Sequence, residues 1–369
     1  MSRAYDNAAD ARFQQGGRRN LIINGAMQVA QRGDQTGLSS TAYGPDRFRL
    51  AGSRSEATWD FDQSTDAPDG FSSSLKVTID TPETTLSASD QMNLQQRLEG
   101  FDVQHLKKGT TDAVSVTLSF WVKSSLTTTW TVELYDTSNT RMISKTFSTN
   151  AANTWEFKSF TFAGDNSGSI PNDNTEGLRV RWWLDGGSNF TSGSINASWA
   201  DYVQANLVEQ ATGFMTTDAA TFQITGVQLE VGSVATPFEN LSYGEQLSLC
   251  QRYYYNHTPK GLDGSTKSVV MNAAAYQTSS VFGVLHFPVP MRTSPTLDFD
   301  NTVDNLYRIF HNGTNTNCRA SEFAIQRSEV NSIALAAQGL SGFTVGHAAW
   351  IETNAASGNV GMCCFDAEL

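Results

Sequence analysis

Apolar and polar residues alternate through most of the N-terminal part of the chain. The clearest case is VSVTLSFWV at residues 114–122, in which apolar side chains occupy every second position. The same pattern recurs at residues 130–135, 155–162 and 178–184, and clusters of Gly, Asn, Asp and Pro separate the segments. Many short strands with turns between them are typical of an antiparallel sandwich. The sequence therefore predicts an all-β jelly-roll or β-sandwich domain over residues 20–240.

A short helix is expected after this domain. Ser242 and Glu245 have the spacing of a capping box, in which each side chain accepts a hydrogen bond from the other residue's backbone amide. We place a linking helix at residues 241–255. Beyond it, further strand-like segments interrupted by prolines predict a smaller C-terminal β domain over residues 256–369.

Residues 1–19 form a polar segment that contains Arg and Gly and too few large apolar side chains to cover a core. Such an arm either stays disordered or becomes ordered on a partner. We expect this arm to attach the chain to a larger particle. The candidate contact residues are Arg3, Tyr5, Arg12, Phe13, Arg18 and Arg19.

Composition and charge narrow the possible functions. The chain has 369 residues, room for two or three domains, and only 17% of them are charged, which argues against helix-rich folds. Lys and Arg number 25 against 37 Asp and Glu, a net charge of −12, so a nucleic-acid partner is not expected. No apolar run approaches the roughly 18 residues of a membrane span, and no secretory signal is readable, so no membrane insertion is expected.

Catalytic motifs are not evident in the sequence. The glycines lack the G-x-G and G-x-S-x-G spacings, and no histidine pair has metal-binding spacing. Nothing selects a catalytic pair among the many carboxylates. The cysteines lack C-x-x-C spacing, so we expect reduced and mostly buried thiols. We therefore predict a non-enzymatic protein with no catalytic residue and no resident cofactor.

Two acidic pairs are candidates for binding Ca²⁺. Asp60 and Asp62 lie two residues apart, as do Asp298 and Asp300, and on a strand each pair shares one face. Calcium takes several oxygen ligands, but neither segment has the glycine and terminal glutamate of an EF-hand loop. Solvated strand ends are therefore the main interpretation, and a calcium site is the alternative.

Trp182 and Trp183 are candidates for contacting a sugar. Neighbouring residues on a regular strand point to opposite faces, so at most one of the two is expected in the core and the other is exposed. An exposed Trp ring can stack on the apolar C–H face of a sugar. A tryptophan in a β-sandwich more often packs in the core or at an interface, so packing is the main interpretation and contact with a sugar is the alternative.

Several sequence blocks carry a family resemblance. In order, they are NLIING at 20–25, QRG at 31–33, YGPDRF at 43–48, QQRLEG at 95–100, TLSFWVKS at 117–124, ITGVQLEVGSVATPFE at 224–239 and YGEQLSLCQRYY at 243–254. Together they resemble blocks of tailed-bacteriophage virion structural proteins of the tail-fibre or appendage kind. The resemblance covers about residues 20–255, together with FPVPMRTSP at 287–295 and DAEL at 366–369.

The resemblance implies a phage structural protein whose first domain is similar to carbohydrate-binding-module sandwiches and which often forms a homotrimer. From the polar arm, the β-rich acidic body and these blocks together, we predict location in the virion, with assembly in the host bacterial cytoplasm. We also predict contacts with other virion proteins and engagement of a host-surface glycan or receptor. The nearest alternative is a capsid-bound head fibre or decoration protein. A polysaccharide depolymerase and a secreted carbohydrate-binding module are more distant alternatives.

The blocks themselves look structural. Asn24, Gly25 and Gly33 suit turns. The alternation in residues 227–231 predicts a strand with buried valine and leucine and with Gln228 and Glu230 pointing outward. We therefore expect these blocks to serve the fold rather than a ligand.

Overall fold

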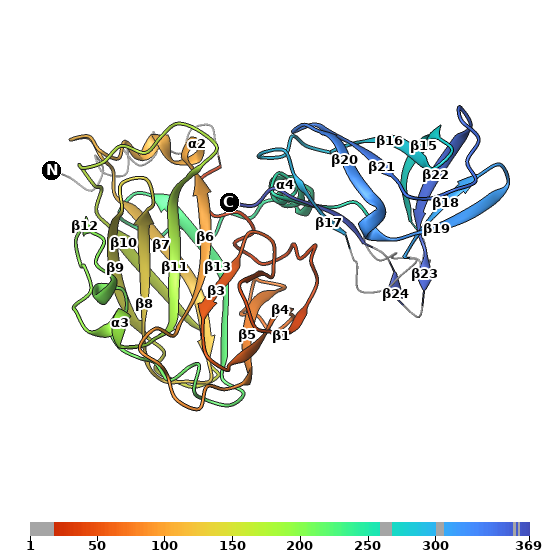
Figure 1. Ribbon diagram of the computed structural model, residues 1–369. Coiled ribbons are helices and arrows are strands. Elements are labelled where there is room, and N and C mark those ends of the chain that lie inside the picture. The colour runs from red at the N-terminus through yellow and green to blue at the C-terminus, as the bar shows by residue number, and fades with distance from the viewer. Residues whose placement is uncertain (1–17, 259–267, 300–305, 357–358, 361) are drawn as a thin grey trace. The chain divides into compact units, whose positions relative to one another are not determined.

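The computed structural model describes residues 18–258, 268–299, 306–356, 359–360 and 362–369 (Figure 1). The chain divides into two compact units. The first comprises the residues up to Gln246 together with Leu369, and the second comprises Leu247–Glu368. Strands dominate both units, which confirms the predicted all-β class. None of the helices in the described ranges is long and apolar enough to span a membrane.

The first unit is built from two antiparallel sheets. The six-stranded sheet has the spatial order β1 (Gln35–Leu38), β4 (Thr58–Ser64), β5 (Ser74–Thr81), β13 (Thr221–Val231), β7 (Val116–Ser124) and β10 (Glu156–Phe162). The seven-stranded sheet has the order β12 (Ala200–Asp201), β9 (Arg141–Ser148), β8 (Thr129–Asp136), β11 (Glu176–Gly186), β6 (Gln91–Glu99), β3 (Arg49–Ser53) and β2 (Ala42–Tyr43). Short helical turns connect the strands, namely α2 (Gly100–Val103), η1 (Gln104–Leu106), α3 (Ser188–Thr191) and η2 (Gln204–Asn206).

Aromatic side chains from both sheets meet in the core of this sandwich. Phe120 of β7 packs edge-on against Trp182 of β11, with ring centroids 5.6 Å apart and planes inclined by 88°. Both side chains are fully buried, and each contributes roughly 1.5–3 kcal/mol or more through removal of apolar surface from water. The predicted alternation along residues 114–122 therefore corresponds to a strand whose apolar face forms the sandwich interior.

The second unit begins within α4 (Tyr243–Gln251). The predicted capping box is present, since the Glu245 carboxylate accepts from the Ser242 amide at 2.9 Å and the Glu245 amide donates to the Ser242 hydroxyl at 3.4 Å. A three-stranded sheet has the order β14 (Tyr254–Asn256), β25 (Cys363–Asp366) and β17 (Thr296–Phe299). The remaining short elements are η3 (Ala320–Glu322) and the paired strands β23 (Ala355–Ala356) and β24 (Asn359–Val360).

A seven-stranded antiparallel sheet forms the larger layer of the second unit. Its order is β19 (Thr314–Cys318), β18 (Tyr307–His311), β22 (Ala348–Thr353), β15 (Val269–Gln277), β16 (Ser280–His286), β21 (Ser332–Ala337) and β20 (Phe323–Ser328). Its inner face contributes Ile309, Leu335 and Ile351 to a core shared with Phe365 of the smaller sheet. Alternate residues of the same strands therefore point away from this core, onto what we call the outer face.

Candidate functional site

The family-like blocks of the first unit meet around the buried side chain of Asn20. The Asn20 amide group donates to the Val227 carbonyl at 2.9 Å, and its oxygen accepts from the amides of Ile22 and Leu229, both at 3.0 Å. The Asn20 backbone amide donates to the Glu239 carboxylate at 2.8 Å. The N-terminal block is thereby bonded to a block more than two hundred residues further along the chain.

Asn24 and Gln96 join further blocks to the same network. Asn24 adopts a positive φ of 59°, which confirms the predicted turn, and its side chain bonds both the amide and the carbonyl of Val29. Gln96 exchanges two hydrogen bonds with the backbone of Ile23, at 2.8 and 2.9 Å. The Gln246 side chain accepts from the Asn24 amide at 2.9 Å. The polar groups of these blocks bond one another, as expected for parts of the fold.

Gln228 and Glu230 differ from the expectation, because both side chains are buried rather than outward. The chain after β13 folds back over them. The Thr236 amide and hydroxyl donate to the two carboxylate oxygens of Glu230 at 2.9 and 2.6 Å, and the Glu239 amide donates to the Gln228 side chain at 2.8 Å. The outward prediction is wrong because a following segment covers this face of the strand.

The predicted arm lies mostly outside the described residues, which exclude Arg3, Tyr5, Arg12 and Phe13. Arg18 and Arg19 are described, and both bond their own chain. Arg18 donates to the Leu21 carbonyl at 3.3 Å, and the Arg19 guanidinium lies 3.4 Å from the Glu230 carboxylate. These two residues therefore anchor the start of the first unit, and attachment of the arm to a particle stays a prediction.

Trp182 and Trp183 point to opposite faces of β11, as alternation requires, but both are buried, at 0% and 1% exposure. Trp183 packs against Phe190, Leu207 and Val208 from the segment that contains α3 and η2. Its indole N–H donates to the Glu133 carboxylate at 2.8 Å. The expectation that one of these tryptophans is exposed to a sugar is wrong, because this segment covers the second face of the strand.

Three of the four residues in the two acidic pairs lie in the described ranges, namely Asp60, Asp62 and Asp298. The Asp60 carboxylate accepts a hydrogen bond from the Gly37 amide at 2.9 Å. Burial raises the pKa of Asp62 above its usual value, and the neighbouring carboxylates Asp34 and Asp60 raise it further. Asp298 accepts from the Tyr254 hydroxyl at 3.0 Å, and Asp300 lies outside the described residues. No group of three or more His, Cys, Asp or Glu side chains there is arranged to hold a metal ion.

The four cysteines, Cys250, Cys318, Cys363 and Cys364, are free and buried. Burial raises the pKa of Cys318 to about 12 and raises the pKa of Cys363. A thiol with a raised pKa is protonated at neutral pH, and the thiolate is the reactive form. At least these two cysteines are therefore packing residues and not activated nucleophiles.

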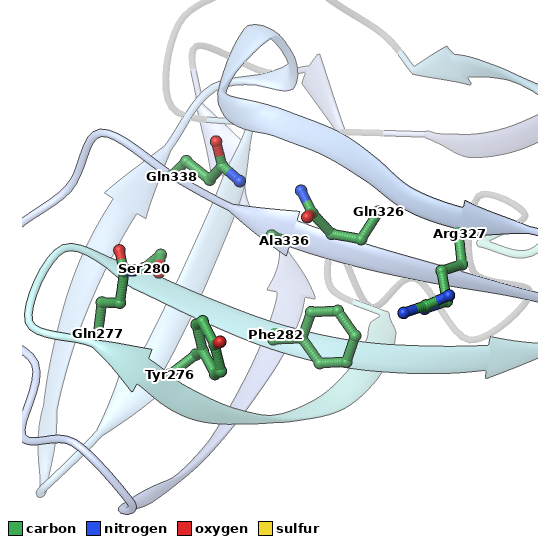
Figure 2. A pocket seen from close by; sticks show the side chains of 8 residues that line it. All are labelled: Tyr276, Gln277, Ser280, Phe282, Gln326, Arg327, Ala336 and Gln338. Atoms are coloured by element: carbon green, nitrogen blue, oxygen red, sulfur yellow. The ribbon is translucent and has the colours of Figure 1, made fainter.

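The outer face of the second unit holds a groove of about 400 Å³, which Figure 2 shows from close by. We call it the outer groove. Its lining residues are Tyr276, Gln277, Ser280, Phe282, Gln326, Arg327, Ala336 and Gln338. In Figure 2 the rings of Tyr276 and Phe282 lie on one side of Ala336, and Gln326 and Arg327 lie on the other.

Small side chains on β21 create this hollow. Phe282 of β16 is paired with Ala336, and Ala336 is paired in turn with Ala324 of β20. The two methyl groups of Ala336 and Ala324 beside the longer Phe282 side chain leave a depression on this face of the sheet. The outer groove therefore depends on the register between β16 and β21, because it requires an alanine at the position opposite Phe282.

Irregularities in the flanking strands bring further side chains to the outer groove. β15 has a register shift between Ala275 and Gln277, and β20 has one between Ile325 and Arg327. In a regular strand, neighbouring side chains point to opposite faces, but a bulge redirects one of them. This accounts for two consecutive pairs, Tyr276 with Gln277 and Gln326 with Arg327, lining one hollow.

None of the residues that line the outer groove was among the candidates predicted from the sequence. Residues 268–274 and 280–287 read as strands in the sequence, and the alternate alanines of SIALAA at 332–337 are a signal for a face with little side-chain volume. The sequence does not predict that β16 pairs with β21, because about 45 residues separate the two strands.

Comparison with known proteins gives only distant similarities. No protein-family model matches the sequence, and no curated protein matches it. Among solved structures, the chain is similar to the enzymatically active domain of tailspike protein 4 of bacteriophage CBA120, at 13% identity and a TM-score of 0.30 over 58% of this chain. The chain covers only 21% of that tailspike chain.

Carbohydrate-binding modules are also among the similar solved structures. A CBM4 structure shares 14% identity at a TM-score of 0.31, covering 57% of this chain and 99% of that chain. A family 11 carbohydrate-binding module of a Clostridium thermocellum cellulosomal cellulase shares 9% identity at a TM-score of 0.29, covering 55% of this chain and 97% of that chain.

Proposed function

We propose that this chain is a non-enzymatic structural protein of a tailed-bacteriophage particle, of the tail-fibre or appendage kind, which engages a glycan on the host surface. The observation that carries the proposal is the meeting of the family-like blocks around Asn20 and Asn24. Blocks that bond one another inside one folded unit constitute a single module. The resemblance therefore extends over a coherent piece of structure rather than over isolated short motifs.

The particle would hold this chain through its N-terminal arm, bound to other virion proteins, and the β units would project toward the host. We propose a homotrimer, because weak sites that are linked in one assembly bind with a high effective concentration. Light scattering over a wide concentration range tests this assembly. A stable monomer throughout that range would contradict it.

Immunogold labelling of intact virions with antibody against this chain tests the proposed role directly. Gold on the tail or its fibres is the expected result. Gold over the head would indicate a capsid-bound head fibre or decoration protein instead. Absence of gold from the particles would contradict a location in the virion.

The non-enzymatic part of the proposal has its own test. The full chain is incubated with purified host polysaccharide, and new reducing ends are measured over time. We expect none to form. Steady release of reducing ends would instead indicate a depolymerase.

A further inference from the structure

We propose that the outer groove of the second unit binds an acidic sugar, meaning a pyranose that carries a carboxylate. Tyr276 and Phe282 would contact the apolar face of the ring, and Arg327 would bind the carboxylate. This inference rests on the proposed function and gives that function a ligand class and a site (Figure 2).

The aromatic side of the outer groove supports contact with a sugar ring. Tyr276 is 70% exposed although it lies at the end of a paired strand. Its ring centroid lies 6.4 Å from that of Phe282, with the planes inclined by 46°. The exposed Tyr276 ring and the half-buried Phe282 ring can present π faces to the C–H groups of a pyranose.

Arg327 supplies charge complementarity for an anion. Of the described residues that line the outer groove, Arg327 is the only charged one, and no carboxylate lines it. Arg327 has no ion-pair partner within the described ranges, whereas Arg308 on the same sheet is paired with Glu352. A guanidinium presents a planar fork of N–H donors that matches a carboxylate with two parallel hydrogen bonds.

The remaining lining residues suit hydroxyl groups. Gln277, Gln326 and Gln338 carry both a donor and an acceptor, and Ser280 adds a hydroxyl. This neutral polar rim argues against an apolar peptide as the occupant. The outer groove has a single cationic side chain among its described lining residues, and the chain has a net charge of −12. Both facts argue against nucleic acid as the occupant, because binding to nucleic acid requires a row of basic residues.

The first test compares two forms of one ligand. The probe is a hexasaccharide that contains glucuronate, and its control is the same hexasaccharide with every carboxylate reduced to a primary alcohol. Titration calorimetry on the full chain should show binding of the acidic form and at least about tenfold weaker binding of the reduced form, the loss of one charged hydrogen-bonded contact. A chain that binds neither form, or binds both equally, overturns the proposal.

Matched variants locate the binding. Arg327→Gln should weaken binding of the acidic hexasaccharide at least about tenfold. Lys145→Gln makes the same change of charge in the first unit and should leave the affinity unchanged. Equal losses in both variants would indicate a general electrostatic effect and would overturn the assignment to the outer groove.

Filling the hollow provides a test that leaves all charges in place. Ala336→Leu places a larger side chain between Phe282 and Ala324 and should abolish binding, whereas Ala348→Leu adds the same volume at an exposed position of β22 and should not. Unchanged thermal unfolding identifies the variants that are folded. If Ala336→Leu does not fold, the titration of Arg327→Gln tests the site instead. Retained binding in a folded Ala336→Leu overturns the site. Virion labelling is independent of these titrations, so the proposed role and the proposed ligand fail separately.

Discussion

The indole ring of Trp350 stacks on the phenyl ring of Phe310, with centroids 4.8 Å apart and planes inclined by 13°. The two residues lie directly opposite each other on β22 and β18. The next pair along these strands on the same face is Arg308 with Glu352, whose side chains form an ion pair. Cross-strand pairs of this kind fix the register of an antiparallel sheet.

We expect this stack to stabilise the pairing of β18 with β22. A double-mutant cycle with Phe310→Ala and Trp350→Ala should give a coupling free energy of about 0.5–1.5 kcal/mol in urea unfolding, since aromatic pairs contribute this amount beyond their buried area. Phe310→Ala combined with Val284→Ala, an exposed residue on β16, three strands away from β18, serves as the control cycle and should show no coupling. Additive effects of the first two substitutions would show that the stack contributes nothing.

Asn20 is expected to be a stability residue of the first unit. Asn20→Ala removes the partners of the Ile22 and Leu229 amides and of the Val227 carbonyl, all within a buried region. Unpaired buried polar groups are costly, so the free energy of unfolding should fall by about 2–4 kcal/mol. Asn172→Ala, at an exposed position, should change it by less than about 0.5 kcal/mol. Equal stability of the two variants would contradict the structural role of the network.

The strands were predictable because they depend on local alternation. Residues 114–122 show this clearly, since one apolar face is sufficient to identify a half-buried strand whatever it packs against. The capping box at Ser242 was predictable for the same reason, because both partners lie within one turn of helix.

Burial of the opposite faces was not predictable from local pattern. Trp183 and Glu230 are buried by segments that return over strands β11 and β13, and nothing in the strand sequences encodes that covering. The outer groove likewise depends on which strand lies beside β16. Alternation identifies the two faces of a strand, but only the tertiary fold determines which of them reach water.

Trp183 is expected to act on stability and not on ligand binding. Trp183→Phe leaves one oxygen of the buried Glu133 carboxylate without its indole donor, so the free energy of unfolding should fall by about 2–3 kcal/mol. Trp155→Phe removes a similar N–H bond to Asp66 at a partly exposed site, and water can replace it at a cost below about 1 kcal/mol. Weaker binding of the acidic hexasaccharide to a normally stable Trp183→Phe variant would restore this tryptophan as a ligand contact.

The thiols should be inaccessible in the folded protein. All four cysteines are buried, and burial raises the pKa of Cys318 to about 12, so the reactive thiolate is scarce as well as shielded. We expect no modification by a thiol reagent at mildly alkaline pH, and modification of all four cysteines in concentrated guanidinium. Rapid labelling of any cysteine under native conditions would show that its part of the fold opens readily.

His257 links the stability of the second unit to pH. Its Nε2 lies 2.8 Å from the Val270 carbonyl oxygen, and its Nδ1 lies 2.8 Å from the Tyr255 hydroxyl. A carbonyl oxygen can only accept, so Nε2 carries the hydrogen and the Tyr255 hydroxyl donates to Nδ1. Burial lowers the pKa of His257 below its usual 6.5, more than the hydrogen bonds to the backbone raise it.

The direction of the pH dependence follows from this shift. Below pH 6.5 the unfolded chain binds a proton at His257 that the folded unit does not, so the free energy of unfolding falls as the pH is lowered, by at most about 1.4 kcal/mol per pH unit from this group. Above pH 6.5 both states are neutral at this residue and its contribution is constant. Urea unfolding between about pH 7.5 and about pH 5.5 should show a flatter profile for His257→Gln than for the wild type. His286→Gln, at an exposed position of the same unit, should keep the wild-type slope, and parallel profiles for all three proteins would exclude His257 as the titrating group.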